Sequence, residues 1–244
     1  MNLPLTPQSI ASLLDHSTLQ PFLTDEDVRR GCEIALKYQT ASVCARPSDM
    51  PLAVRLLAGS PVKACTVIGF PHGTATTESK VFEARQALAL GCEELDMVIH
   101  IGRMLQGDLG YVESDIRAVA EAAHAHGAIL KVILENCYLG DEQKVAACKV
   151  AEQAGADFVK TSTGYGKSGA TIDGVRLMRQ SVSAKVRVKA AGGMRDLDAV
   201  LAAKAAGAER CGVSATEAII EEAYRRYEAG TLFENEAGVL SDGY

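Results

Sequence analysis

The chain has 244 residues, of which 48% are apolar, and these values fit one large domain over residues 1–244 with a sizeable buried core. Its formal net charge of -6, without a long basic run, argues against nucleic acid or an anionic membrane as the main partner. Residues 1–5 lack the pattern of a signal peptide and no apolar stretch approaches the roughly 20 residues of a membrane span, so we expect a cytoplasmic protein.

Short apolar runs alternate with amphipathic helical patterns along the chain. Runs of strand type occupy residues 13–15, 41–44, 62–68, 94–99, 128–134, 157–161, 186–190 and 209–213. Apolar positions at helical spacing cover residues 25–37, 49–57, 76–90, 112–126, 141–154, 172–180, 197–206 and 215–227. Glycines that typically end a helix stand before four of the strands, at Gly91, Gly127, Gly155 and Gly207. Eight such units predict a (β/α)8 TIM barrel.

The structural alternative is a doubly wound open sheet. No predicted strand is followed by the G-x-G-x-x-G turn of the dinucleotide-binding version, and helices follow strands to the end of the chain. The barrel is therefore the preferred fold.

Cysteines and histidines give no sign of a metal site. The seven cysteines contain no C-x-x-C pair, and the five histidines lack metal-ligand spacing. We expect reduced thiols and no metal.

Lysines stand at the ends of two predicted strands, Lys160 and Lys189. Lysine is rarely fully buried, so an ammonium group at the end of an apolar strand needs a reason. Active sites of (β/α)8 barrels lie at the C-terminal ends of the strands. The alternation of side chains along a strand directs both lysines, and Asp96 of the run 94–99, into the barrel. These three residues are the predicted catalytic group.

Neighbouring amines favour nucleophilic amine chemistry. A lysine with an unperturbed pKa of about 10.4 is neutral in only about 0.04% of molecules at pH 7. A second ammonium group and poor solvation both lower that pKa and release the free amine. We assign the nucleophile to Lys160, whose strand is more apolar, and proton transfer to Lys189, although the residues alone also allow the reverse.

An alternative without chemistry is a layer of buried ion pairs that fills the barrel. Charged residues of the central strands supply such a layer: Asp96, Lys131, Glu135, Lys160, Arg187 and Lys189.

Glycine turns after the last two strands indicate a phosphate site, because backbone N–H groups and a helix N-terminus bind phosphate there in many barrels. The loop after Lys160 offers further contacts, with its lysine as a formal positive charge. The expected residues are Gly164, Lys167, Gly192, Gly193, Gly212 and Ser214. As alternatives, residues 214–217 form an ordinary helix-capping box and Lys167 is a solvated loop residue.

Five segments carry a resemblance to a known family: residues 66–73 (TVIGFPHG), 94–98 (ELDMV), 131–135 (KVILE), 154–164 (AGADFVKTSTG) and 189–193 (KAAGG). With them the chain resembles the deoxyribose-phosphate aldolases, class I (Schiff-base) aldolases, over nearly its whole length. The resemblance implies a TIM barrel that reversibly cleaves 2-deoxy-D-ribose 5-phosphate to acetaldehyde and D-glyceraldehyde 3-phosphate, without metal or organic cofactor.

The resemblance also implies roles for individual residues. Lys160 forms the imine, Lys189 perturbs it and helps to move protons, and Asp96 accepts and donates protons through a water. A protonated imine is an electron sink, so the C–C bond breaks to an enamine in place of a costlier enolate. Positions that match the family near the substrate are Asp15, Thr18 and Cys44.

Several positions depart from the family pattern: the segment 15–19 (DHSTL), Arg46, His100 and Tyr165. The resemblance therefore does not assign the residues that contact the outer part of the substrate. In some family members a terminal tyrosine reaches the site, and this chain ends in Tyr244.

Two other functions remain open from the sequence. One is another Schiff-base barrel aldolase or a transaldolase-like enzyme. The other is a non-catalytic barrel that binds a sugar phosphate. The expected partners are small molecules, with a homodimer as a further possibility.

Overall fold

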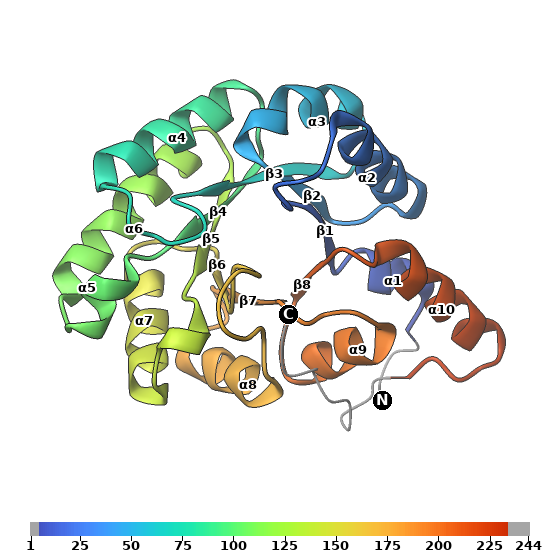
Figure 1. The fold of residues 1–244 in the computed structure, drawn as a ribbon. Coiled ribbons are helices and arrows are strands. Elements are labelled where there is room, and N and C mark those ends of the chain that lie inside the picture. Colours follow the sequence, from blue (N-terminus) through green and yellow to red (C-terminus); the bar gives the residue numbers. More distant parts are fainter. Residues whose placement is uncertain (1–4, 234–244) are drawn as a thin grey trace.

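Eight parallel strands close into a barrel in chain order, and helices surround it (Figure 1). A computed structural model describes residues 5–233, so Tyr244 lies outside the described residues. The strands are β1 Leu14–Thr18, β2 Ser42–Ala45, β3 Lys63–Ile68, β4 Glu94–Val98, β5 Ile129–Ile133, β6 Phe158–Lys160, β7 Arg187–Ala191 and β8 Arg210–Val213. The predicted TIM barrel is confirmed.

The helices follow the predicted order with small shifts at their ends. They are α1 Pro7–Ala11, α2 Asp25–Tyr38, α3 Met50–Leu57, α4 Thr77–Ala89, α5 Ile101–Leu105, α6 Leu109–His124, α7 Asp141–Gln153, α8 Ile172–Ser181, α9 Leu197–Ala205 and α10 Thr216–Glu228. Short 3-10 helices occupy η1 Pro47–Asp49 and η2 Asn136–Tyr138. The sequence patterns did not predict α1 and α5, which are only five residues long.

Local signals explain where the long helices begin and end. Thr24 caps α2 through a reciprocal pair of hydrogen bonds with Asp27. The four glycines expected after helices, at positions 91, 127, 155 and 207, all have positive φ angles. Each lets the chain turn from a helix into the next strand.

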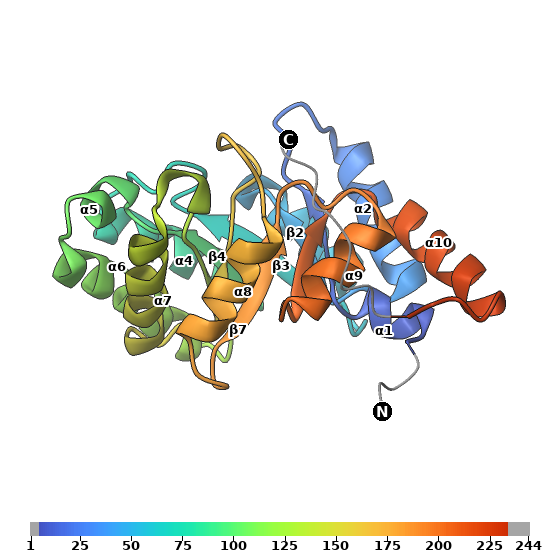
Figure 2. The ribbon, with the colours of Figure 1, turned by 90° about the horizontal axis from the view of Figure 1, so that it is seen from below.

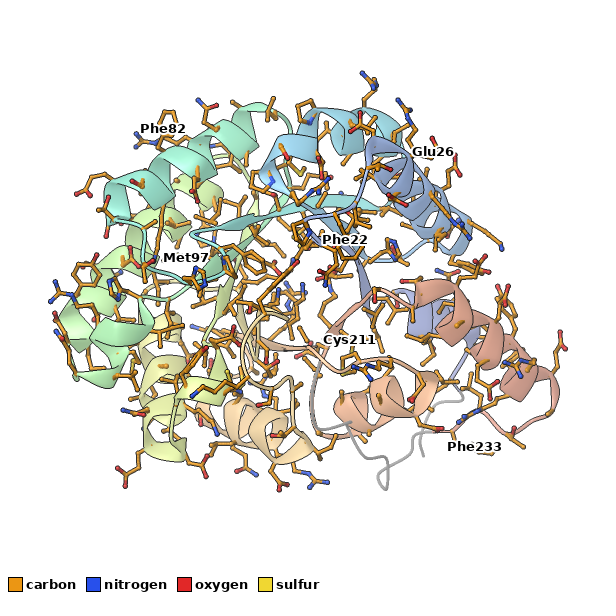
Figure 3. The ribbon with its side chains drawn as sticks, viewed as in Figure 1. Phe22, Glu26, Phe82, Met97, Cys211 and Phe233 are labelled. Atoms are coloured by element: carbon orange, nitrogen blue, oxygen red, sulfur yellow. The ribbon has the colours of Figure 1, made fainter. Side chains whose placement is uncertain are left out.

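Alternating side chains of the strands divide the interior into two layers. Leu95 and Met97 belong to the large apolar core between strands and helices, whereas Cys44, Cys65 and Val67 form a small separate cluster. In Figure 3, Met97 and Cys211 lie among the buried side chains and Phe82 lies on the outer side of α4. Asp96, between Leu95 and Met97, therefore faces the opposite layer.

Figure 2 shows the loop after β1 and the loop between β6 and α8 rising from the same end of the barrel. Both loops follow strands, so this is the C-terminal end, where barrel active sites lie. Within residues 5–233, no helix has the length and apolar character needed to cross a membrane.

Candidate active site

Two lysines lie side by side at the ends of adjacent strands. The register of the sheet pairs Lys160 of β6 with Lys189 of β7. Both amines contact the same oxygen of Asp96: Oδ2 is 2.7 Å from Nζ of Lys160 and 2.8 Å from Nζ of Lys189. Asp96 is completely buried and Lys160 is 3% exposed. The carboxylate thus lies behind the two amines and holds them together.

A network of buried charges extends from Asp96 toward the other end of the barrel. Lys131 lies 2.8 Å from Asp96 Oδ1 and 2.6 Å from Glu94 Oε2. Lys189 lies 2.5 Å from Asp15 Oδ2. Four members of the ion-pair layer considered from the sequence belong to this network, namely Asp96, Lys131, Lys160 and Lys189, and the network adjoins an open cavity. The other two members lie elsewhere, since Glu135 accepts hydrogen bonds from Thr163 and Arg187 lies over the Phe158 ring.

Arg210 of β8 completes this network. Its guanidinium lies 2.6 Å from Asp15 Oδ1 and 3.2 Å from Glu94 Oε2. Lys131, Lys189 and Arg210 each contact at least two carboxylates, whereas Lys160 contacts Asp96 alone among the described residues. Lys160 is therefore the cation with the fewest ion pairs in this network.

These charges also set protonation states. Burial by itself raises the pKa of Asp96, but the ammonium groups around it outweigh burial and hold that pKa well below its ordinary value. For Lys189, burial lowers the pKa, yet Asp15 and Asp96 raise it above the ordinary value. Asp96 is therefore a carboxylate and Lys189 an ammonium group at neutral pH.

A cavity of about 320 Å³ opens at the C-terminal end of the barrel. Lys160 and Lys189 line one part of it, and turns that follow β7 and β8 line another. The lining residues are Asp15, Ser17, Leu19, Gln20, Cys44, Lys160, Thr163, Gly164, Tyr165, Lys189, Ala191, Gly192, Gly193, Met194, Arg195, Gly212, Val213 and Ser214.

Most of the residues predicted for the site line this cavity. Three do not. Asp96 lies behind the lysines, Thr18 is buried with its hydroxyl 3.5 Å from the Cys44 carbonyl oxygen, and Lys167 lies over the Tyr138 ring with Nζ 5.3 Å from the ring centre. The loop lysine expected near a phosphate is thus outside the cavity wall.

The turn after β7 holds the residue that sequence reasoning missed. Gly192 and Gly193 have φ angles of 83° and 77°, and Arg195 follows them. Arg195 is exposed, lines the cavity and has no ion-pair partner within residues 5–233. A basic residue two positions after the glycine pair was the available signal.

Ser214 lines the same end of the cavity, next to the first turn of α10. The N-cap of α10 is Ala215, which makes no side-chain cap hydrogen bond, and Glu217 instead forms an ion pair with Lys37. The capping-box interpretation of residues 214–217 is therefore wrong, because the helix begins one residue later. The Ser214 hydroxyl is left at the cavity.

Of the positions that depart from the family pattern, Tyr165 and part of the segment 15–19 line the cavity, whereas Arg46 and His100 do not. Arg46 forms an ion pair with Asp49 at 2.6 Å. His100 is the N-cap of α5 and packs edge-on against Tyr111. These two residues shape the loops around the site.

Cys44, Cys65 and Asp96 bring three potential metal-ligand atoms within 4.8 Å of one another. A hydrogen bond from Cys65 lowers the pKa of the Cys44 thiol, while burial raises that of Cys65 well above its ordinary value. The three ammonium groups already paired with Asp96 oppose a cation at this place.

Comparison with known proteins gives concordant results. Residues 9–222 match the family described as DeoC/LacD family aldolase. The deoxyribose-phosphate aldolase of Rhodopirellula baltica is 48% identical over 89% of this chain and 90% of its own length. That of Thermococcus gammatolerans is 50% identical over 88% and 96%. The tetrameric deoxyribose phosphate aldolase structure from Aeropyrum pernix superposes with a TM-score of 0.84 at 32% identity, covering 92% of this chain and 93% of that one.

Proposed function

The chain belongs to the DeoC/LacD family of aldolases, and we propose that it reversibly cleaves 2-deoxy-D-ribose 5-phosphate to acetaldehyde and D-glyceraldehyde 3-phosphate through a Schiff base on Lys160. As a member of an aldolase family, it is a carbon–carbon lyase. Its relatives from Rhodopirellula baltica and Thermococcus gammatolerans bear the name deoxyribose-phosphate aldolase, which supports this substrate.

The observation that carries the proposal is the shared contact of Lys160 and Lys189 with Asp96 beside the cavity. The buried network around Asp96 has four cations, Lys131, Lys160, Lys189 and Arg210, and three carboxylates, Asp15, Glu94 and Asp96. Lys160 has a single carboxylate partner in this network, Asp96, whereas Lys189 has two, Asp15 and Asp96. This argument favours Lys160 over Lys189 as the nucleophile.

The reaction begins when the Lys160 amine adds to the C1 aldehyde of the open-chain sugar. Lys189 donates the proton that leaves with the hydroxyl as water, and a protonated imine remains. Asp96 accepts the C3 hydroxyl proton through a water, and because its pKa is low it relays this proton to Lys189 without retaining it.

Removal of that proton breaks the C2–C3 bond, and the bonding electrons flow into the protonated imine. The products are D-glyceraldehyde 3-phosphate and an enamine on Lys160. Protonation of the enamine at C2 and hydrolysis of the imine then release acetaldehyde and the free amine.

The far end of the cavity suits the phosphate group. The turn of Gly192 and Gly193 lines this end, Ser214 offers a hydroxyl beside the N-terminus of α10, and Arg195 offers a positive charge. These groups supply positive potential locally in a chain of net charge -6. We assign the phosphate to this end.

Borohydride trapping tests the reaction class and the nucleophile together. Acetaldehyde with borohydride is expected to leave a reduced two-carbon adduct on the peptide that contains Lys160. Lys160→Met is expected to retain the fold and lose at least about 10³-fold in cleavage, because a thioether fills similar space without an amine.

Lys63→Met is the control, since Lys63 is an exposed residue at the start of β3 that pairs with Glu93. It is expected to keep normal trapping and turnover. An adduct confined to other lysines, or near-normal cleavage by Lys160→Met, would refute the assignment.

We further propose a cytoplasmic location and a homo-oligomeric assembly. All seven cysteines are free thiols, as is usual in the reducing cytoplasm. The relative from Aeropyrum pernix is a tetramer, so the state of this chain, a dimer in our expectation, is to be measured by light scattering.

A further inference from the structure

Tyr165 stands between the catalytic cavity and a second cavity at the same end of the barrel. The second cavity has a volume of about 290 Å³. Thr163 and Tyr165 line both cavities. The other walls of the second cavity include the apolar surfaces of Pro71, Ile101 and Tyr138. The Tyr165 side chain is thus part of the partition between two spaces of similar size.

Contacts across the mouth fix the side chain of Tyr165. Its hydroxyl donates a hydrogen bond of 2.8 Å to the carbonyl oxygen of Leu19, which follows β1. Its ring meets the Phe70 ring edge-on, with 5.5 Å between ring centres and an angle of 90°. Burial raises the pKa of Tyr165, so the hydroxyl stays protonated as a donor. The two loops that rise together in Figure 2 are joined by this bond.

The segment after Leu19 is itself braced. The Arg46 guanidinium donates hydrogen bonds to the carbonyl oxygens of Gln20, Pro21 and Leu23, at 3.1, 3.2 and 2.9 Å. Three carbonyls held by one guanidinium leave the segment little freedom. Arg46 therefore acts on the cavity through the loop after β1.

The backbone of Tyr165 is braced from the other side by Glu135. The buried Glu135 carboxylate accepts hydrogen bonds from the backbone N–H of Thr163, at 3.3 Å, and from its hydroxyl. The Thr163 hydroxyl oxygen in turn accepts a bond of 3.0 Å from the N–H of Tyr165.

Glu135 itself has a φ of 53°, in the left-handed region that disfavours a residue with a side chain. A Cβ on Gly166 would lie 3.1 Å from the Glu135 carboxyl carbon and 2.7 Å from the Cys137 sulfur. The hydrogen bonds to Thr163 and the close packing of Gly166 thus hold Glu135 in this strained conformation.

We propose that Tyr165 is a specificity-determining residue, which closes the catalytic cavity toward the second cavity and so limits the length of the aldehyde that the enzyme accepts. This inference rests on the proposed function. An alkyl chain without a phosphate has no partner at the Gly192–Gly193 end of the cavity. The apolar walls of the second cavity suit such an alkyl chain. Each methylene group buried there is expected to strengthen binding of the aldehyde about fourfold.

The test is the condensation of acetaldehyde with propanal, butanal, pentanal or hexanal, measured as kcat/KM for each acceptor. Wild type is expected to lose activity as the chain lengthens. Tyr165→Ala is expected to raise the ratio of hexanal to propanal about 10-fold or more, because two or more methylenes gain access to the second cavity. Tyr165→Leu is expected to raise this ratio less. If the alanine variant does not fold, the leucine variant alone tests the inference.

Tyr138→Ala is the matched control, because Tyr138 lines the second cavity and not the catalytic one. Alone it is expected to leave the ratio unchanged, because Tyr165 still closes the catalytic cavity. Combined with Tyr165→Ala it is expected to reduce the gain, because it removes part of the apolar wall that the alkyl chain contacts. An unchanged ratio in both Tyr165 variants, or an equal rise in Tyr138→Ala alone, would overturn the inference. Failure of wild type to form the trapped Lys160 adduct would instead overturn the proposed function.

Discussion

Two basic residues near the predicted phosphate site, Arg195 and Lys167, differ in their surroundings. Arg195 lines the cavity beside Gly192 and Gly193, while Lys167 lies over the Tyr138 ring outside it. A guanidinium also presents a planar set of donors that matches phosphate. At the scale of single residues, position relative to the cavity therefore favours Arg195 as the phosphate-binding charge.

Arg195→Gln is accordingly expected to lower kcat/KM for the phosphorylated sugar by about 10- to 100-fold, the effect of losing a hydrogen bond to a charged group. Steady-state kinetics with phosphorylated and unphosphorylated substrates measure this change, and activity on the latter is expected to stay the same. Lys167→Gln is the control, with an expected change below about threefold. A larger effect of Lys167→Gln than of Arg195→Gln would reverse the assignment.

Predictions for individual residues agreed with the structure where the signal lay within one strand, and differed from it where the position depended on how a loop folds. The inward direction of Lys160, Lys189 and Asp96 follows from alternation along single strands, and the structure agrees. The position of Lys167 depends on how a loop folds back over Tyr138, which no spacing in the chain encodes.

At the scale of elements, the loop between β6 and α8 packs closely on the turn after β7. A Cβ on Gly169 would lie 2.3 Å from the carbonyl oxygen of Gly192. The next residue, Ala170, donates its N–H to the carbonyl oxygens of Ala191 and Gly192, at 3.0 and 3.1 Å. The position of the glycine turn therefore depends on the absence of a side chain at residue 169.

Gly169→Ala is expected to displace this turn, to lower the free energy of unfolding by about 1–3 kcal/mol and to raise KM for the phosphorylated sugar. Chemical denaturation and steady-state kinetics measure the two effects. Gly110→Ala is the control, because a Cβ there meets open space near the start of α6 and alanine favours a helix. Unchanged stability and KM in Gly169→Ala would show that the turn tolerates the displacement.

The strands were predictable as short apolar runs, and the long helices because each extends over several turns with a clear helical period. The two missed helices, α1 and α5, have five residues each and offer too few positions for a period to emerge. The first residue of α10 was also misjudged, since Ser214 and Glu217 have the spacing of a capping box without its hydrogen bonds.

For the whole molecule, the buried charges link stability to pH. Burial by itself raises the pKa values of Asp15 and Asp96, but the surrounding lysines lower both below their ordinary values, and Arg210 lowers that of Asp15 further. Both carboxyls therefore bind protons more weakly in the folded chain than in the unfolded chain. Their contribution to stability is complete above the unfolded pKa of about 4 and is lost as pH falls through the folded values.

We expect Tm to decline progressively below about pH 4 in thermal melts recorded from pH 7 to pH 2. Glu217→Gln, which removes an exposed ion pair with Lys37, serves as the control and is expected to leave this decline unchanged. A Tm that stays constant between pH 4 and pH 2 would contradict the role of the buried carboxylates.

The sequence by itself determined the barrel, the order of its strands and the pair of lysines at the site, because alternation, helical period and apolar runs are local properties. The shared contact of Lys160 and Lys189 with Asp96 required strand register and barrel closure, which bring residues 64 and 93 positions apart into contact. Only the tertiary structure decided that Arg195 lines the cavity and that Tyr165 separates two cavities. Those positions depend on packing between loops from different strands, and a linear pattern carries no information about such packing.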